Sequence, residues 1–136
     1  MDVTIASGVH AQILRHAAED PAREVCGLLF GEAAGIATAE PTANVHADPA
    51  RFFEVDPAAL FAALRRERAG GSCLIGHYHS HPHGHAEPSI DDAAAVGSSF
   101  DRLWLIVAQG EIAAFRAVQG GAIHGRFDRV ALMTAD

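Results

Sequence analysis

The sequence has few cysteines, no excess of basic residues and no long apolar run. Only two cysteines occur, Cys26 and Cys73, and no Cys-x-x-Cys pair is present. Both lie in apolar, strand-like stretches, so we expect buried thiols rather than a disulfide or a zinc ribbon. The formal net charge of −7 argues against binding nucleic acid, which requires basic patches. No apolar run approaches the roughly 20 residues that cross a bilayer, and the first residues lack a leader pattern. We therefore expect a cytoplasmic protein that binds no membrane.

No repeat, low-complexity segment or linker divides the chain, so we expect a single domain covering residues 1–136. Its 49% apolar content is enough to build a core without disulfides. Helical spacing and capping signals predict three helices, over residues 8–19, 57–69 and 90–98. Alternating or buried apolar runs predict strands before residue 8 and over 25–31, 36–43, 51–55, 72–79, 102–109 and 111–118, with a weak one near 122–128. This alternation is typical of an α/β sandwich around a mixed β-sheet.

A histidine-rich segment, residues 76–82, is the most informative part of the chain. Side chains two apart on a strand share one face, so His79 and His81 point to one side and form a candidate metal-binding pair. His77 and His81 lie roughly 13 Å apart along a straight strand, whereas zinc–nitrogen bonds are about 2 Å long. We therefore expect His77 to be a packing or supporting residue. The other histidines of the segment are expected in the loop that follows, at His83 and His85.

A third ligand for the same ion is available from Asp92, if a helix begins near Ser89. Three protein ligands leave one tetrahedral position open, which distinguishes a catalytic from a structural zinc site. Ser89 and Asp92 also fit a helix capping box, which needs no metal, although capping and ligation are compatible. The histidines alone are equally consistent with an exposed polar loop or a tract that takes up metal without catalysis.

The spacing of these residues resembles the signature of the JAMM (MPN-plus) metalloprotease family. His79-Ser-His81-Pro is followed by seven residues, then by Ser89, two residues and Asp92. An upstream glutamate, Glu24, precedes the apolar run Cys-Gly-Leu-Leu-Phe-Gly, as it does in that family.

Two further features, Asn44 and the Phe-Glu-Val-Asp-Pro run at 53–57, look like the compact prokaryotic members. The resemblance covers residues from about 5 to about 118, and it implies a cytidine-deaminase-like three-layer fold.

The resemblance also implies a role for each residue of the site. His79, His81 and Asp92 would hold one catalytic Zn²⁺. Glu24 would take the proton from the bound water and pass it to the leaving amine, and the Ser89 hydroxyl would donate a hydrogen bond to the oxyanion. Composition and spacing alone do not single out Glu24 from the other acidic residues.

The function implied is that of a zinc isopeptidase, deubiquitinase-like, acting after the C-terminal Gly-Gly of a ubiquitin-like or sulfur-carrier protein. Only seven residues separate His81 from Ser89, which leaves no room for the insertions that grip a particular ubiquitin linkage, so a small prokaryotic substrate is favoured. A non-catalytic scaffold of the same fold and a zinc peptidase acting on a phage-tail or cell-wall component remain alternatives. Neither the oligomeric state nor metal binding by His77, His83 or His85 follows from the sequence.

Overall fold

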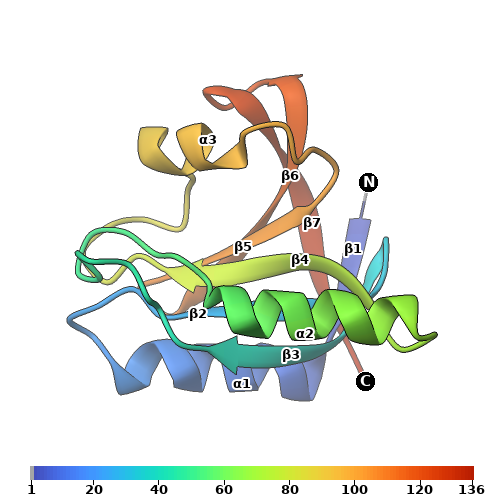
Figure 1. Ribbon diagram of the computed structural model, residues 1–136. Coiled ribbons are helices and arrows are strands. Elements are labelled where there is room, and N and C mark those ends of the chain that lie inside the picture. Colours follow the sequence, from blue (N-terminus) through green and yellow to red (C-terminus); the bar gives the residue numbers. More distant parts are fainter. Residues whose placement is uncertain (1) are drawn as a thin grey trace.

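The computed structural model describes residues 2–136 and combines seven strands with three helices among them. The helices are α1 (Ser7–Glu19), α2 (Pro57–Arg68) and α3 (Ile90–Val96). The strands are β1 (Asp2–Ala6), β2 (Cys26–Glu32), β3 (Gly35–Thr42), β4 (Cys73–Ser80), β5 (Leu103–Ala108), β6 (Glu111–Gly121) and β7 (Gly125–Ala135). The expected mixed α/β class is confirmed (Figure 1).

The strands form one curved sheet in the order β1-β3-β2-β4-β5-β6-β7, and β1 pairs with β7 to close it into a barrel. The sheet is mixed, as expected, because β1 runs parallel to β3 and β7, and β4 runs parallel to β5, whereas the other neighbours are antiparallel. Because the sheet closes, it does not form the open central layer of the expected sandwich. β4 lies between β2 and β5, so its C-terminal end is surrounded by other elements.

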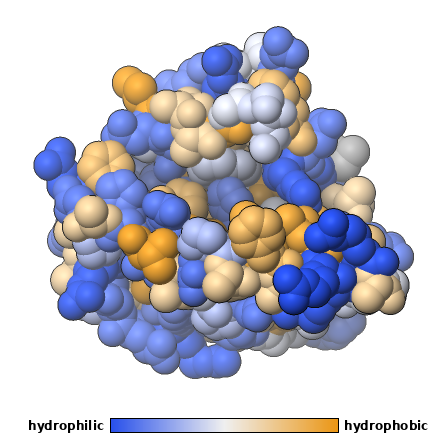
Figure 2. All heavy atoms as spheres, viewed as in Figure 1, coloured by the Kyte–Doolittle hydropathy of each residue, from blue (hydrophilic) through white to orange (hydrophobic). Residues whose placement is uncertain are grey.

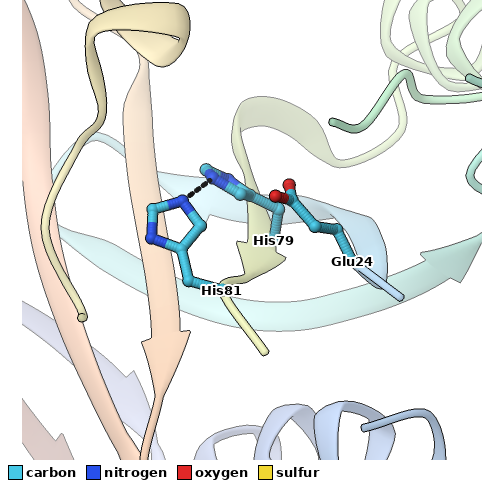
Figure 3. Close-up of side chains that lie close together, drawn as sticks. All are labelled: Glu24, His79 and His81. Carbon is cyan, nitrogen blue, oxygen red and sulfur yellow. Dashed lines mark hydrogen bonds between the residues drawn. The ribbon is translucent and has the colours of Figure 1, made fainter. Parts of the chain in front are cut away.

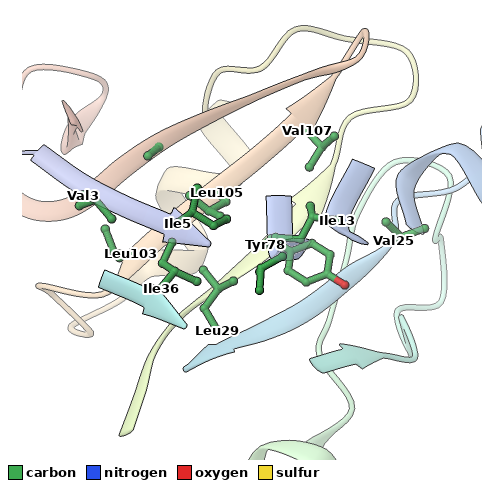
Figure 4. Close-up of a cluster of buried hydrophobic side chains, with 12 residues drawn as sticks. Val3, Ile5, Ile13, Val25, Leu29, Ile36, Tyr78, Leu103, Leu105 and Val107 are labelled. Carbon is green, nitrogen blue, oxygen red and sulfur yellow. The ribbon is translucent and has the colours of Figure 1, made fainter. Parts of the chain in front are cut away.

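Alternation along the strands separates two sides of the sheet. The side chains of Leu29 and Tyr78 pack with Ile13 of α1 in the largest buried cluster (Figure 4). The preceding residue of β2, Leu28, instead packs with Ala63 of α2. On β4, His77 and His79 flank Tyr78 and point away from that cluster. This alternation aims both imidazoles at the side of the sheet where α2 and α3 lie.

The segment predicted as a strand at 51–55 is not one. It contributes a single bridge, between Asn44 and Val55. Turn hydrogen bonds from the amides of Arg51 and Phe52 to the carbonyl of Asp48 bend the chain at its start, so the segment cannot extend into a ladder. It remains an irregular loop beside the end of β4.

Two further expectations are corrected. β7 is much longer than the weak strand expected near 122–128, and most of its side chains are exposed, which explains its faint apolar pattern. Cys73 is exposed, whereas Cys26 is buried as expected, and both thiols are free. Cys73 is the first residue of β4, one residue after the Gly70-Gly71 turn.

The start of α2 is capped, as the sequence signals at Asp56 and Pro57 predict. The Asp56 side chain accepts a hydrogen bond from the Ala58 amide (3.0 Å) at the start of α2. On the surface, Arg66 of α2 pairs with Glu40 of β3 (2.9 Å). Across residues 2–136, no helix has the length and apolar character needed to span a membrane.

Candidate functional site

The structure brings the candidate metal ligands together at the C-terminal end of β4. His79 lies in β4, His81 follows directly after the strand, and Asp92 lies in the first turn of α3. The Nε2 atoms of the two histidines are 3.0 Å apart. One carboxylate oxygen of Asp92 lies 3.2 Å from His79 Nε2, and the other lies 3.2 Å from His81 Nε2. The proximity of these three side chains, predicted from their spacing in the sequence, is present in the structure.

This arrangement fits a bound metal ion. Ligand atoms about 2.0–2.1 Å from a tetrahedral zinc are about 3.3 Å from one another, which is close to the observed separations. Two imidazole nitrogens and a carboxylate are also a donor set that small divalent cations accept. Asp92 is buried and ionised, and a buried charge requires a partner. The three side chains can therefore hold one divalent cation.

Glu24 lies beside the two histidines. Ligand atoms of Glu24, His79 and His81 lie within 4.8 Å of one another, and Figure 3 shows the carboxylate directed toward the imidazoles. Burial raises the pKa of Glu24 to about 8; His81 opposes this rise and Asp92 adds to it. The register of β2 with β4 explains the proximity, because Cys26 is paired with His79. A carboxyl group so placed can exchange a proton near neutral pH.

Asp92 has the opposite electrostatic character. Burial by itself would raise its pKa, but hydrogen bonds with His79 and His81 and one from the Ser89 amide hold the pKa of Asp92 well below its ordinary value. Asp92 is therefore a carboxylate at any physiological pH. Two neighbouring carboxyl groups, Glu24 and Asp92, thus differ in proton affinity, which is the pattern expected of an acid–base group beside a ligand.

The capping box at the start of α3 is present as predicted. Ser89 Oγ accepts a hydrogen bond from the Asp92 amide (3.0 Å), and Asp92 Oδ2 accepts one from the Ser89 amide (2.9 Å). The same carboxylate faces both histidines, so capping and participation in the site occur together. Because the hydroxyl of Ser89 acts as an acceptor in the cap, its own proton remains available to donate.

The two candidate ligand histidines are held differently. His81 Nδ1 is 2.8 Å from the backbone carbonyl of His85. Among residues 2–136, His79 Nδ1 has no hydrogen-bond partner; its ring instead stacks on Phe53, with centroids 4.1 Å apart. Sequence reasoning assigned no role to Phe53 beyond a family pattern, because nothing local links it to β4.

The remaining histidines behave as expected. His77 packs edge-on against Trp104, with ring centroids 4.3 Å apart, and burial lowers the pKa of His77 to about 3. It is a neutral packing residue. His83 is exposed in the loop, and no group of candidate metal ligands among residues 2–136 includes His77, His83 or His85.

A groove runs from the site along the face between α2 and α3. Its part beside Glu24 and Asp92 has a volume of about 390 Å³ and is also lined by Phe53 and Ser89, among others. A second part, of about 410 Å³, is lined mainly by apolar residues, including Leu60, Leu64, Val96 and Trp104. Both parts share Phe53 and Ala95. Figure 2 shows this face hollowed between α3 and α2, with hydrophobic residues along the rim formed by α2.

Comparison with known proteins identifies the family of the chain. A family model described as prokaryotic homologs of the JAB domain matches residues 6–118, and the chain belongs to this family. It is 36% identical over 96 residues to a desampylase from Haloferax volcanii, covering 66% of this chain and 69% of that protein. It is 33% identical over 88 residues to a probable TtuB-protein conjugate cleaving protease from Thermus thermophilus, covering 65% of this chain but only 59% of that one.

The fold also agrees with a solved structure. Protein DSY2949 from Desulfitobacterium hafniense superposes with a TM-score of 0.82 at 23% identity, over 98% of this chain and 93% of that protein. At this identity the likeness concerns the fold.

Proposed function

We propose that the protein is a zinc-dependent isopeptidase or peptidase that cleaves after the C-terminal Gly-Gly of a ubiquitin-like or sulfur-carrier protein. The observation that carries the proposal is the convergence of His79, His81 and Asp92 with the Glu24 carboxyl group beside them. Family membership and the names of both relatives, which concern the removal of small protein modifiers, support the same substrate class. A cytoplasmic location is part of this proposal.

Each residue has a chemical task in this reaction. His79, His81 and Asp92 would hold the zinc ion, and zinc bound there would lower the pKa of a water molecule and polarise the scissile carbonyl. Glu24 accepts a proton at its carboxylate and delivers it to the leaving amine, a role that its position beside His79 and His81 suits. The Ser89 hydroxyl donates a hydrogen bond to the oxygen on which negative charge develops.

The groove supports an extended peptide substrate. Phe53 and Ala95 border both of its parts, so a chain leaving the site passes directly into the apolar part. Glycines have no side chain, so their backbone can lie close to Glu24 and Ser89. An apolar side chain upstream of them can occupy the space between Leu60, Leu64 and Trp104. This order of small and apolar positions suits the flexible C-terminal tail of a ubiquitin-like protein.

The test is cleavage of ubiquitin-like and sulfur-carrier proteins that carry C-terminal extensions or lysine conjugates. We expect the zinc-loaded protein to cut after Gly-Gly. Glu24→Gln should lower kcat by at least about 10²-fold, in line with the loss of an acid–base group, and keep its zinc. His81→Ala should lose both activity and stoichiometric zinc, whereas His83→Ala, a histidine two residues away in the exposed loop, should keep both. Unchanged cleavage by Glu24→Gln would overturn the proposal.

The same experiment separates an enzyme from a scaffold of the same fold. A scaffold needs no metal, so a wild-type protein that retains no zinc after dialysis and cleaves no member of the panel would favour that alternative. Stoichiometric zinc that depends on His81 would count against it.

A further inference from the structure

The backbone at Glu24 needs support from outside the sheet. Glu24 and Val25 precede β2 and belong to no strand. The Glu24 amide donates to the carbonyl of Pro49 (2.7 Å), and the Val25 amide donates to Ser80 Oγ (2.9 Å). The carbonyl of Glu24 accepts a hydrogen bond from Asn44 Nδ2 (2.8 Å). Side chains and loops, rather than a strand ladder, therefore fix this residue.

Asn44 uses its whole side-chain amide in this support. Besides Glu24, its Nδ2 donates to the carbonyl of Phe52 (2.9 Å). Its Oδ1 accepts from the amides of His46 (3.1 Å) and Glu54 (3.0 Å). An asparagine amide offers two donor hydrogens and two acceptor lone pairs, so all four are used. One half-buried side chain thus ties the segment before β2 to the loop ahead of α2.

The loop held by Asn44 carries the ring that stacks on His79. Phe53 lies between Phe52 and Glu54, both of which are bonded to Asn44, and its ring lies 4.1 Å from the His79 ring. Asn44 therefore contacts the two segments that carry Glu24 and Phe53, the residue whose ring stacks on His79. Asn44 lines a separate depression that it shares with Glu24. It does not line the part of the groove beside Asp92.

We propose that Asn44 is a positioning residue, which holds the main chain of Glu24 and the 52–54 loop so that the Glu24 carboxylate faces His79 and His81. An aspartate in its place accepts the two amide hydrogen bonds but, when ionised, cannot donate to the carbonyls of Glu24 and Phe52. An alanine makes none of the four. The turnover part of the proposal rests on the proposed function; the structural part does not.

The experiment compares Asn44→Ala and Asn44→Asp with wild type. We expect both variants to bind stoichiometric zinc and to lose about 10- to 100-fold in kcat, as is typical when the support of a catalytic group is removed, with KM little changed. Amide hydrogen exchange at Glu24 and Val25 should accelerate in both. Gln12→Ala is the matched control, because it removes an amide-to-carbonyl hydrogen bond (Gln12 Nε2 to the Ala39 carbonyl, 3.2 Å) away from the site. It should leave kcat and exchange at Glu24 unchanged.

Wild-type kcat in a folded Asn44→Asp, a rise in KM alone, or loss of zinc would overturn the assignment. If Asn44→Ala does not fold, Asn44→Asp decides, because it retains the two acceptor hydrogen bonds. If the wild-type protein cleaves no ubiquitin-like substrate, the proposed function fails, and the exchange measurement alone decides the role of Asn44. In that case, wild-type amide exchange rates at Glu24 and Val25 in Asn44→Asp would reject the positioning role of Asn44.

Discussion

The rings of Phe53 and His79 are stacked, with centroids 4.1 Å apart and planes inclined by 15°. Metal-binding histidines usually have their second ring nitrogen fixed by a carboxylate or a carbonyl. Within the described residues 2–136, Nδ1 of His79 has no such partner. The His79 ring is instead oriented by stacking on Phe53 and by an edge contact with Trp104.

Replacing Phe53 by leucine should weaken zinc binding by about 10- to 100-fold, the range seen when a ligand loses its supporting contact. The leucine keeps an apolar contact but offers no flat ring to stack on His79. Chelator competition measures the affinity. Phe52→Leu is the control, since the Phe52 ring lies against His46, 5.0 Å away, and should leave the affinity unchanged. Equal zinc affinities for the two variants would show that stacking does not orient the ligand.

Metal binding should release a proton from Glu24. At pH 7 the metal-free protein holds this proton, because the pKa of Glu24 is about 8, and a nearby dication favours the carboxylate. Wild type should therefore release close to one proton more than Glu24→Gln on binding zinc. Calorimetry in buffers of different ionisation enthalpy gives this number. The difference should vanish above about pH 9, where Glu24 is already ionised, and an equal release at pH 7 would refute the prediction.

Gly27 should not tolerate a side chain. A Cβ atom at this position would lie 2.3 Å from Cε1 of Tyr78, whose buried ring is anchored by a hydrogen bond between its hydroxyl and His16 (2.7 Å). Gly27→Ala should cost about 1–3 kcal/mol of unfolding free energy, as overpacking does. Gly8→Ala, in α1 with no atom within 4 Å of the new Cβ, should be neutral or stabilising by up to about 1 kcal/mol. Urea unfolding compares the two, and equal effects would contradict the packing argument.

The partial burial of His16 should make stability depend on pH. Burial lowers the pKa of His16 below its ordinary value, although Glu19 and Asp20 act to raise it. The unfolded chain therefore binds the proton more readily than the folded one, so this contribution to stability is present above about pH 6.5 and is lost as the pH falls. His16→Gln should lose less unfolding free energy than wild type between pH 8 and pH 5. If the unfolding free energies of wild type and His16→Gln changed in parallel with pH, His16 would not be the source of the pH dependence.

The grouping of the candidate metal ligands could be predicted because their geometry is local. Alternation on a strand relates His79 to His81, and the first turn of a helix relates Ser89 to Asp92, so spacing along the chain determines spacing in the fold. Glu24 is different. The antiparallel pairing of β2 with β4 brings it near the site, and hydrogen bonds from other loops hold it there. Neither can be inferred from spacing along the chain, so only the resemblance to a family pointed to Glu24.

The contributions of Phe53 and Asn44 were beyond the reach of sequence patterns for a related reason. Both lie in irregular segments, where no periodicity predicts the direction of a side chain, and the apolar run at 51–55 favoured a strand instead. The closure of the sheet was missed because β7 exposes most of its side chains, so its apolar signal is weak even though β1 pairs with it over five residues.

The carboxylate of Asp92 belongs both to the capping box of α3 and to the candidate metal site. α3 has only seven residues, and short helices are marginal in water without tertiary support. Local opening of its first turn would therefore carry Asp92 away from His79 and His81 in the same event. The residence time of a bound ion is thus tied to the fraying of a short helix, and a substrate packed against α3 would slow metal loss while it is bound.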